Sequence, residues 1–367
     1  MLLVIFACFI LSNCNICNDE SDEYFRNLIE NYTFHDLDTM FADSVLIGPS
    51  SSNLYIFMQG LKNTEEYSMV RKMTYNHTEE WLKGFRGDYS SSSPTIDNNE
   101  NFFYLVRDPN NRLLIYQFNA TSGILTDSPF IDSAYCRSHG WRINISPDNN
   151  YMYINSMLIS TNNSMVCKFW IDRSSPSKCF LSETFNPAPF MQLLYDSTVF
   201  TTFISNEPEH YPLLQILDFN SEQMQTSKII NWGQSNWITN YGPILYNSSD
   251  TSIYMMPIFE SLGYATFITL DSQTLDLKNS AYSINNVENV YSMYDYAANI
   301  YILLKATGSK IYRYDTEALV FEVFLYTSSE YTFYHMSPMD YAYDSKRVVI
   351  VGSKDSDTRI LVTKTLK

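Results

Sequence analysis

The sequence predicts an all-β fold made of seven similar units, and two observations carry this prediction. Short apolar segments recur along the 367 residues at intervals of 47 to 53 residues. A second apolar segment follows each of them and often ends in Asp or Asn. A self-similar period of about 40–50 residues made of short strands is the signature of a β-propeller, with one four-stranded blade per repeat.

The recurring segments are predicted to be the central strands of antiparallel blades. Their apolar residues are nearly consecutive, which suits a strand covered on both faces. The seven segments are residues 53–58, 101–106, 150–155, 198–203, 251–256, 299–304 and 346–351.

An inner strand is expected before each central strand and a third strand after it. In five repeats a pair of a small residue and proline should end the inner strand, since proline cannot donate to the ladder. These pairs lie at 48–49, 93–94, 146–147, 242–243 and 337–338. The third strands are expected to begin at residues 66, 112, 164, 212, 264, 309 and 358. Several end in Asp or Asn near Ser or Thr, which favours an Asx turn into a fourth, outer strand.

One repeat carries a resemblance to a known group of proteins. The segment ISPDNNYMYIN at 145–155 and the strand ending in WIDRSS at 170–175 resemble the blade of YVTN-type and quinoprotein-like propellers. The resemblance covers residues 44–367 and concerns the fold, because that superfamily includes scaffolds, adhesion modules, lyases, lactonases and dehydrogenases. The Gly-His and Trp-Asp pairs of WD40 blades are absent.

The chain is predicted to divide into a signal peptide, residues 1–17, an N-terminal lead-in, residues 18–43, and a seven-bladed propeller, residues 44–367. The last repeat ends after its third strand. We therefore expect the lead-in, around residues 32–35, to supply the fourth strand and to close the ring, since an open edge invites aggregation.

The first residues indicate the secretory pathway. An apolar run from Leu2 to Leu11 is too short to span a bilayer and suits a signal peptide cleaved after Cys14 or Cys17. We expect a secreted or endomembrane-lumenal protein without stable membrane insertion after signal removal. Glycosylation sequons agree with that compartment, although an Asn- and Ser-rich chain also makes them by chance. They begin at Asn31, Asn76, Asn119, Asn162 and Asn247, and a sixth at Asn144 is weakened by Pro147.

The charge balance argues against one class of partner. The chain has 24 Lys and Arg against 40 Asp and Glu, a net charge of −16. Such a surface repels phosphate backbones, so no nucleic acid partner is expected. The plainer reading is that the excess of acid keeps the protein soluble.

Two cysteines are predicted to form a disulfide. Cys167 and Cys179 lie six residues either side of Arg173, the centre of the hairpin between the third and outer strands of the third repeat. Residues equidistant from a turn face each other in an antiparallel pair, at a separation that suits a disulfide. Two reduced, packed thiols are the alternative. Cys17 and Cys136 form a weaker second candidate pair.

No complete catalytic or metal-binding motif is present, and no cofactor or metal is expected. The densest polar cluster, residues 132–142, lies on a connection that would line the mouth of a propeller channel. There His139 could act as a general base, with Arg137 or Arg142 holding an anionic group. His335, on a predicted inner strand, could face the same channel. Solvated loop charges and a histidine packed between blades are the structural alternatives.

Other residues suggest binding. Asp132 and Arg142 lie in the same polar cluster, and Trp232 and Trp237 could form an aromatic platform for a sugar or peptide, although they could equally pack between blades. The adhesion tripeptide at 86–88 is a single weak match. We therefore predict a macromolecule-binding module with a protein or glycan ligand on a loop face. The alternative is a hydrolase or lyase acting on a small extracellular substrate with His139, Arg137 and His335.

Overall fold

The computed structural model describes most of the chain between residues 39 and 362, and in this part the regular structure is entirely β. The described ranges are 39–48, 53–62, 65–74, 78–86, 94–107, 113–119, 121–123, 130–131, 137–157, 163–172, 178–185, 191–195, 197–204, 212–229, 238–240, 242–259, 263–296, 299–306, 308–326, 332–341, 345–354 and 357–362. The predicted signal peptide and most of the lead-in therefore lie outside the described residues.

The chain divides into two compact units, and three sheets form the first. Sheet I consists of β1 (Thr39–Ile47), β2 (Leu54–Lys62), β3 (Glu65–Met73) and β4 (Glu79–Arg86). The part of β4 after Leu82 belongs to the second unit. Sheet VI consists of β23 (Asn289–Tyr296), β24 (Asn299–Ala306), β25 (Gly308–Asp315) and β26 (Val320–Tyr326). Sheet VII consists of β27 (Thr332–Tyr341), β28 (Ser345–Lys354) and β29 (Asp357–Val362).

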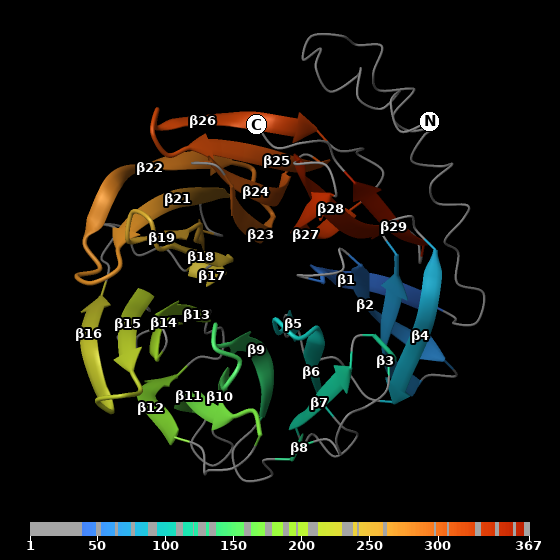
Figure 1. Cartoon of the computed structure of the whole chain (residues 1–367). Coiled ribbons are helices and arrows are strands. Elements are labelled where there is room, and N and C mark those ends of the chain that lie inside the picture. The colour runs from blue at the N-terminus through green and yellow to red at the C-terminus, as the bar shows by residue number, and fades with distance from the viewer. Residues whose placement is uncertain are drawn as a thin grey trace. The chain divides into compact units, whose positions relative to one another are not determined.

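Four sheets form the second unit (Figure 1). Sheet II consists of β5 (Thr95–Ile96), β6 (Asn101–Arg107), β7 (Leu113–Asn119) and β8 (Phe130–Ile131). Sheet III consists of β9 (Arg137–Ile145), β10 (Tyr151–Met157), β11 (Asn163–Trp170) and β12 (Lys178–Phe185). Sheet IV consists of β13 (Met191–Tyr195), β14 (Thr198–Ile204), β15 (Pro212–Asp218) and β16 (Gln223–Ile229). Sheet V consists of β17 (Ile238–Asn240), β18 (Ile244–Asn247), β19 (Ser252–Met255), β20 (Ile258–Phe259), β21 (Tyr264–Asp271) and β22 (Leu277–Asn285).

In the four-stranded sheets the strands pair antiparallel and follow one another in chain order. Each is a meander of an inner, a central, a third and an outer strand. All the predicted central strands and third strands are strands of the structure, which confirms this part of the prediction. The central strands are the most buried, because a neighbouring sheet can cover each face. In β24, for example, every residue from Asn299 to Leu304 is buried.

The six strands of sheet V are the same meander with two strands interrupted. β21 pairs with both β19 and β20 on one side and with β22 on the other, and β17 and β18 pair in turn with β20 and β19. The breaks fall at Pro243 and Pro257, residues that cannot donate to a ladder. The carbonyl of Pro257 still accepts a hydrogen bond from Thr266 N at 3.0 Å, so the two halves stay aligned.

The predicted proline turns are only partly right. Gly48 follows β1, and Ser146 and Pro147 follow β9, as expected. Pro94 instead precedes the inner strand β5, and Pro338 lies inside β27 opposite Val348. β27 is the edge strand of sheet VII, and an edge tolerates proline because one row of its backbone donors has no ladder partner.

The prediction of seven four-stranded blades is wrong in one respect. Six sheets have four or more strands, and within the described residues sheet VII has three. The fourth strand expected there was to come from residues 32–35, which lie outside the described part. The described residues therefore do not show closure of the ring. Within the first unit, β1 does contact β27, β28 and β29, so sheets I and VII are neighbours.

The core of the second unit is divided among the interfaces between consecutive sheets. One cluster of buried side chains, including Phe103 and Ile154, joins sheets II and III. A second, including Tyr153 and Phe219, joins sheets III and IV. A third, including Phe200 and Leu275, joins sheets IV and V. Each sheet thus buries its faces against its neighbours in chain order, as repeat architectures do.

Candidate functional site

The structure places some of the predicted site residues on strands and leaves others outside the described part. Arg137, His139 and Arg142 lie on β9 in the second unit, and His335 lies on β27 in the first. The ladder between β9 and β10 shifts between the pairs Asn155–Arg142 and Met157–Arg137. Asp132, Trp232 and Trp237 lie outside the described residues, as do Asn31, Asn76, Asn162, Cys17 and Cys136.

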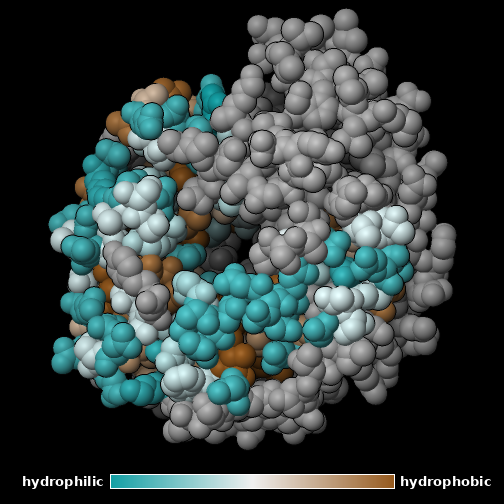
Figure 2. Space-filling view, viewed as in Figure 1, coloured by the Kyte–Doolittle hydropathy of each residue, from teal (hydrophilic) through white to brown (hydrophobic). Residues whose placement is uncertain are grey.

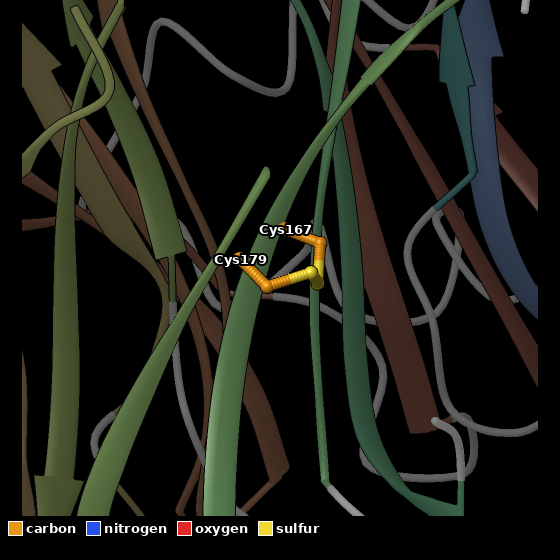
Figure 3. The surroundings of a disulfide bond; sticks show 2 residues. All are labelled: Cys167 and Cys179. Carbon is orange, nitrogen blue, oxygen red and sulfur yellow. A yellow bond between two sulfur atoms is a disulfide. The ribbon is translucent and has the colours of Figure 1, made fainter. Parts of the chain in front are cut away.

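The predicted disulfide between Cys167 and Cys179 is confirmed (Figure 3). The two residues are direct partners in the ladder between β11 and β12, and their Cα atoms are 4.1 Å apart. Cys167 is buried in the core between sheets II and III, whereas Cys179 is exposed. The bond therefore ties an outer strand to the core of its sheet.

The two ends of each sheet differ. At one end, named here the turn end, the inner strand turns into the central strand and the third strand turns into the outer strand. At the other, the loop end, the remaining connections run to the third strand and to the next sheet. Much of the described surface that faces the viewer in Figure 2 is hydrophilic, with hydrophobic side chains showing in places.

An Asp or Asn at the end of the third strand closes four turn-end hairpins. The side-chain Oδ1 accepts hydrogen bonds of 2.8–3.4 Å from the backbone N–H groups two and three residues further along. The capping residues are Asn119, Asp218, Asp271 and Asp315. This confirms the predicted Asx turns.

The last residue of each of these hairpins has a left-handed backbone. It is Gly123 in sheet II, with φ 66°, but Glu222, Leu275 and Leu319 elsewhere, with φ 57–58°. The inner turns repeat this feature at Glu100, Asn149 and Thr251, with φ 54–58°. Because the chain has only 11 Gly, residues with a Cβ occupy positions that glycine would occupy without strain.

The inner turns of sheets II and III are built alike and touch. Asp97 Oδ1 accepts from Asn99 N at 2.9 Å and Asn101 N at 2.7 Å. Across to sheet III, Asn98 N donates to Asn149 Oδ1 at 3.3 Å, and Asn98 Nδ2 donates to Pro147 O at 3.1 Å. The turns thus link neighbouring sheets as well as strands.

Lysines on outer strands make the next links along the second unit. Lys178 on β12 forms an ion pair with Glu222 in the hairpin of sheet IV. One repeat later, Lys228 on β16 forms an ion pair with Asp276 in the hairpin of sheet V. Beside it, Thr226 Oγ1 donates to Gln273 O at 3.1 Å. Both pairs are exposed and screened by solvent, so they fix how the turn ends align more than they stabilise the fold.

Several turn-end carboxylates have a lowered pKa. Backbone hydrogen bonds from Thr274 and Gln273 lower the pKa of Asp271. For Asp218, slight burial raises the pKa, but hydrogen bonds from Asn220, Ser221 and Gln225 outweigh it and the net shift is downward. For Asp148, slight burial likewise raises the pKa, but hydrogen bonds from Ser146 and Asn150 outweigh it and the net shift is downward. These carboxylates are ionised caps and are poorly suited to accept protons as general bases.

Lys168 is the turn-end amine in the most unusual setting. It lies on β11 opposite Tyr153, with Nζ 3.0 Å from Ser197 Oγ and 3.6 Å from the centre of the Tyr151 ring. Partial burial, with repulsion from Lys178, lowers the pKa of Lys168. Lys72 takes the equivalent place opposite Tyr55 in sheet I, where Glu80 pairs with it at 2.6 Å. This repetition indicates that a lysine over a tyrosine is an element of sheet packing.

The described turn end is therefore built for capping and alignment. No group of three or more His, Cys, Asp or Glu side chains among the described residues could hold a metal ion. The part of the chain that the structure covers also contains no helix both long and apolar enough to cross a membrane. The residues predicted to carry chemistry, Arg137, His139 and His335, lie on strands whose side chains are not described, so their meeting in one site stays a prediction.

Comparisons with known proteins place the fold. No family model and no curated protein sequence matches the chain. Solved structures do match the chain. Hydrazine synthase from Kuenenia stuttgartiensis is similar with a TM-score of 0.64 at 10% identity, over 90% of this chain and 98% of that chain. An oligogalacturonate lyase in complex with manganese has a TM-score of 0.60 at 9% identity, over 90% and 91%. The β-propeller domain of the trilobed protease from Pyrococcus furiosus has a TM-score of 0.57 at 8% identity, over 89% and 96%.

The chain has a β-propeller fold. At 8–10% identity these likenesses concern the fold alone. Their functions differ from one another, so the fold is compatible with binding and with catalysis. None of these three structures is described as a YVTN-type protein. The predicted propeller is thus confirmed at the level of fold.

Proposed function

We propose that the protein is a secreted or lumenal β-propeller that binds a protein or glycan through the loop end of its sheets. One observation carries the compartment: the disulfide between Cys167 and Cys179. Disulfides form and persist in oxidising compartments and are rare where thioredoxin and glutathione keep thiols reduced. The apolar segment from Leu2 to Leu11 and the sequons support the same compartment.

The division of labour between the two ends supports the choice of face. At the turn end, side chains such as Asp218 and Asp271 are engaged in capping hairpins, and Lys178 and Lys228 in ion pairs between sheets. At the loop end, the described ion pair between Lys305 and Glu288 lies within sheet VI and does not join two sheets. The binding residues proposed at the loop end are Asp132, Trp232 and Trp237, and Arg142 is proposed on the neighbouring strand β9. Aromatic and arginine side chains are the residue types that most often anchor a protein partner.

We extend the proposal to a closed ring of seven blades of the YVTN type. Its support is the neighbourhood of sheets I and VII in the first unit, where β1 contacts all three strands of sheet VII. Residues that precede Thr39 therefore leave β1 beside the sheet that has three described strands. A fourth strand from residues 18–38 would cap the edge of β29.

The alternative is a hydrolase or lyase with Arg137, His139 and His335 as its working residues. It needs a general base and an anion-holding arginine around one cavity. These residues lie on β9 and β27, in different units. An enzyme of this kind would lose turnover in the variant His139→Ala, and a binding protein would keep its affinity.

The test is a binding measurement on protein made with its own residues 1–17 in a eukaryotic secretory host. Protein collected from the medium is made multivalent and probed on protein and glycan arrays. We expect saturable binding that the paired variant Trp232→Ala/Trp237→Ala removes. The turn-end variant Lys178→Met is the matched control and should bind normally. Retention in the cytosol, or binding lost equally in both variants, would contradict the proposal.

A further inference from the structure

Two of the sequons lie at the turn end of the second unit, and in both the side-chain amide of the asparagine caps a turn. Asn119 ends β7 and opens the hairpin of sheet II. Asn247 ends β18 and opens the inner turn of sheet V. In each, the amide oxygen accepts the capping hydrogen bonds, and the nitrogen Nδ2 is the atom that a glycan would use. One amide can therefore hold the turn and carry a sugar at the same time.

The geometry at Asn247 is the more complete of the two. Its Oδ1 accepts from Ser249 N at 2.9 Å and from the Ser249 hydroxyl at 2.6 Å. Ser249 is the third residue of the sequon, so the motif closes on itself in an Asx turn. No described hydrogen bond engages Nδ2, and Ser248, Ser249 and Asp250 are exposed. A sugar on Nδ2 would break no contact of the described structure.

Asn119 has the same arrangement with a different hydroxyl. Its Oδ1 accepts from Thr121 N at 3.1 Å, from Ser122 N at 3.0 Å and from Ser122 Oγ at 3.2 Å. Thr121 and Ser122 are exposed. The capping hydroxyl comes from Ser122, outside the sequon, whereas Thr121 belongs to it. The two functions of this turn can therefore be separated by substitution.

Asn144 shows the opposite arrangement. It is part-buried on β9, and its Nδ2 donates to Met191 O on β13 at 3.4 Å. That contact joins sheets III and IV in the interior of the second unit. A glycan on Nδ2 would remove the donor and insert a bulky polar group between two packed sheets, which buried structure does not tolerate.

We propose that Asn247 and Asn119 carry N-linked glycans in the native protein and that Asn144 does not. The inference rests on the proposed secretory compartment. In the transfer, Nδ2 forms a bond to the anomeric carbon of an oligosaccharide, the bond to its lipid diphosphate carrier breaks, and Nδ2 loses a proton. No redox step is involved. The sugar is added before or during folding, so the folded structure decides which modified asparagines it can accommodate.

The experiment maps glycopeptides of the full chain secreted from a eukaryotic host, with enzymatic deglycosylation in ¹⁸O-labelled water marking each occupied asparagine. Ser249→Ala should remove one glycan and Thr121→Ala another. The matched variants Ser248→Ala and Ser122→Ala keep the sequons and should keep both glycans, although Ser122→Ala removes a hydroxyl from the cap. The Asn144 peptide should be unmodified.

Two results would overturn the inference. One is an occupied Asn144. The other is an Asn247 and an Asn119 both unmodified while Asn31, Asn76 or Asn162 carries a glycan. A third result, no sequon occupied together with free thiols at Cys167 and Cys179, would overturn the secretory compartment and this inference with it.

Discussion

The left-handed residues of sheet V predict an inverted response to glycine. Thr251 lies at φ 54° and is exposed, in the turn between β18 and β19. Left-handed backbone costs a residue with a Cβ about 1–2 kcal/mol, and a β-branched residue lies at the upper end. Glycine removes that strain but has about 0.5–1 kcal/mol more chain entropy to lose on folding. The net expectation for Thr251→Gly is a gain of about 1 kcal/mol.

Leu275 is the matched position, because it has nearly the same backbone, φ 58°, but a fully buried side chain in the core between sheets IV and V. Truncating a buried leucine costs about 2–5 kcal/mol. Relief of the left-handed strain returns about 1 kcal/mol of this in Leu275→Gly and none of it in Leu275→Ala. Alanine keeps a buried Cβ worth about 0.8 kcal/mol, which offsets most of this relief. We therefore expect Leu275→Gly to be at least as stable as Leu275→Ala, whereas glycine is ordinarily the less stable variant.

The assay is urea unfolding followed by tryptophan fluorescence, with thermal unfolding beside it. At about 2.1 cal/mol/K of unfolding entropy per residue, 1 kcal/mol shifts the melting temperature of 367 residues by only about 1 °C. The urea midpoint is therefore the more sensitive measure for Thr251. Thr251→Ala is the control, because like Thr251→Gly it loses the contact between the hydroxyl and Lys278 Nζ at 3.5 Å. It keeps most of the left-handed strain, so its midpoint should lie below that of Thr251→Gly. Equal midpoints for Thr251→Gly and Thr251→Ala, with Leu275→Gly below Leu275→Ala, would refute the account of these turns.

Three further predictions follow from the turns, the disulfide and the edge of sheet VII. Asp148, Asp218 and Asp271 have lowered pKa values, so the stabilisation they give is complete above the unfolded pKa of about 3.9 and is lost as the pH falls towards the folded pKa values. In the variant with Asn at all three positions, the urea midpoint should therefore fall less steeply between pH 5 and pH 3. An unchanged slope would count against the caps. Cys179→Ala opens a loop of 12 residues and should lower the free energy of unfolding by about 3 kcal/mol. Cys167→Ala should lower it further, because Cys167 is buried in the core. Identical melting with and without reductant would argue against the bond. Deletion of residues 18–38 should cause aggregation or a marked loss of thermal stability, whereas a monomer with unchanged melting would show that these residues close nothing.

Much of the repeat could be predicted from the sequence because its signals are local. Apolar runs such as residues 299–304 mark strands that are buried on both faces, and Asp271 or Asp315 next to Ser, Thr or Glu marks a turn. The disulfide was predictable because strand register depends only on the distance of Cys167 and Cys179 from one turn. These features need no knowledge of neighbouring sheets.

The rest depends on contacts between sheets or on backbone geometry that residue type conceals. Leucine and threonine rarely adopt a left-handed backbone, so the residue type at Leu275 or Thr251 does not predict the positive φ that the structure has there. The predicted central segment 251–256 matches β19, but the strand β20 that resumes beyond Pro257 is not part of the prediction. The pair Lys228–Asp276 joins residues one repeat apart, and a single sequence does not specify such partners. The catalytic alternative stays a prediction, because β9 carries Arg137 and His139 without described side-chain contacts.

The compartment is the premise on which both the proposed binding function and the glycans depend. Non-reducing peptide mapping of protein recovered from the secretory host's medium tests it most directly. The account predicts one linked peptide that contains Cys167 and Cys179, quantitatively oxidised, in protein that begins after residue 14 or residue 17. Absence of the protein from the medium, or free thiols at both Cys167 and Cys179 in what is secreted, would contradict it.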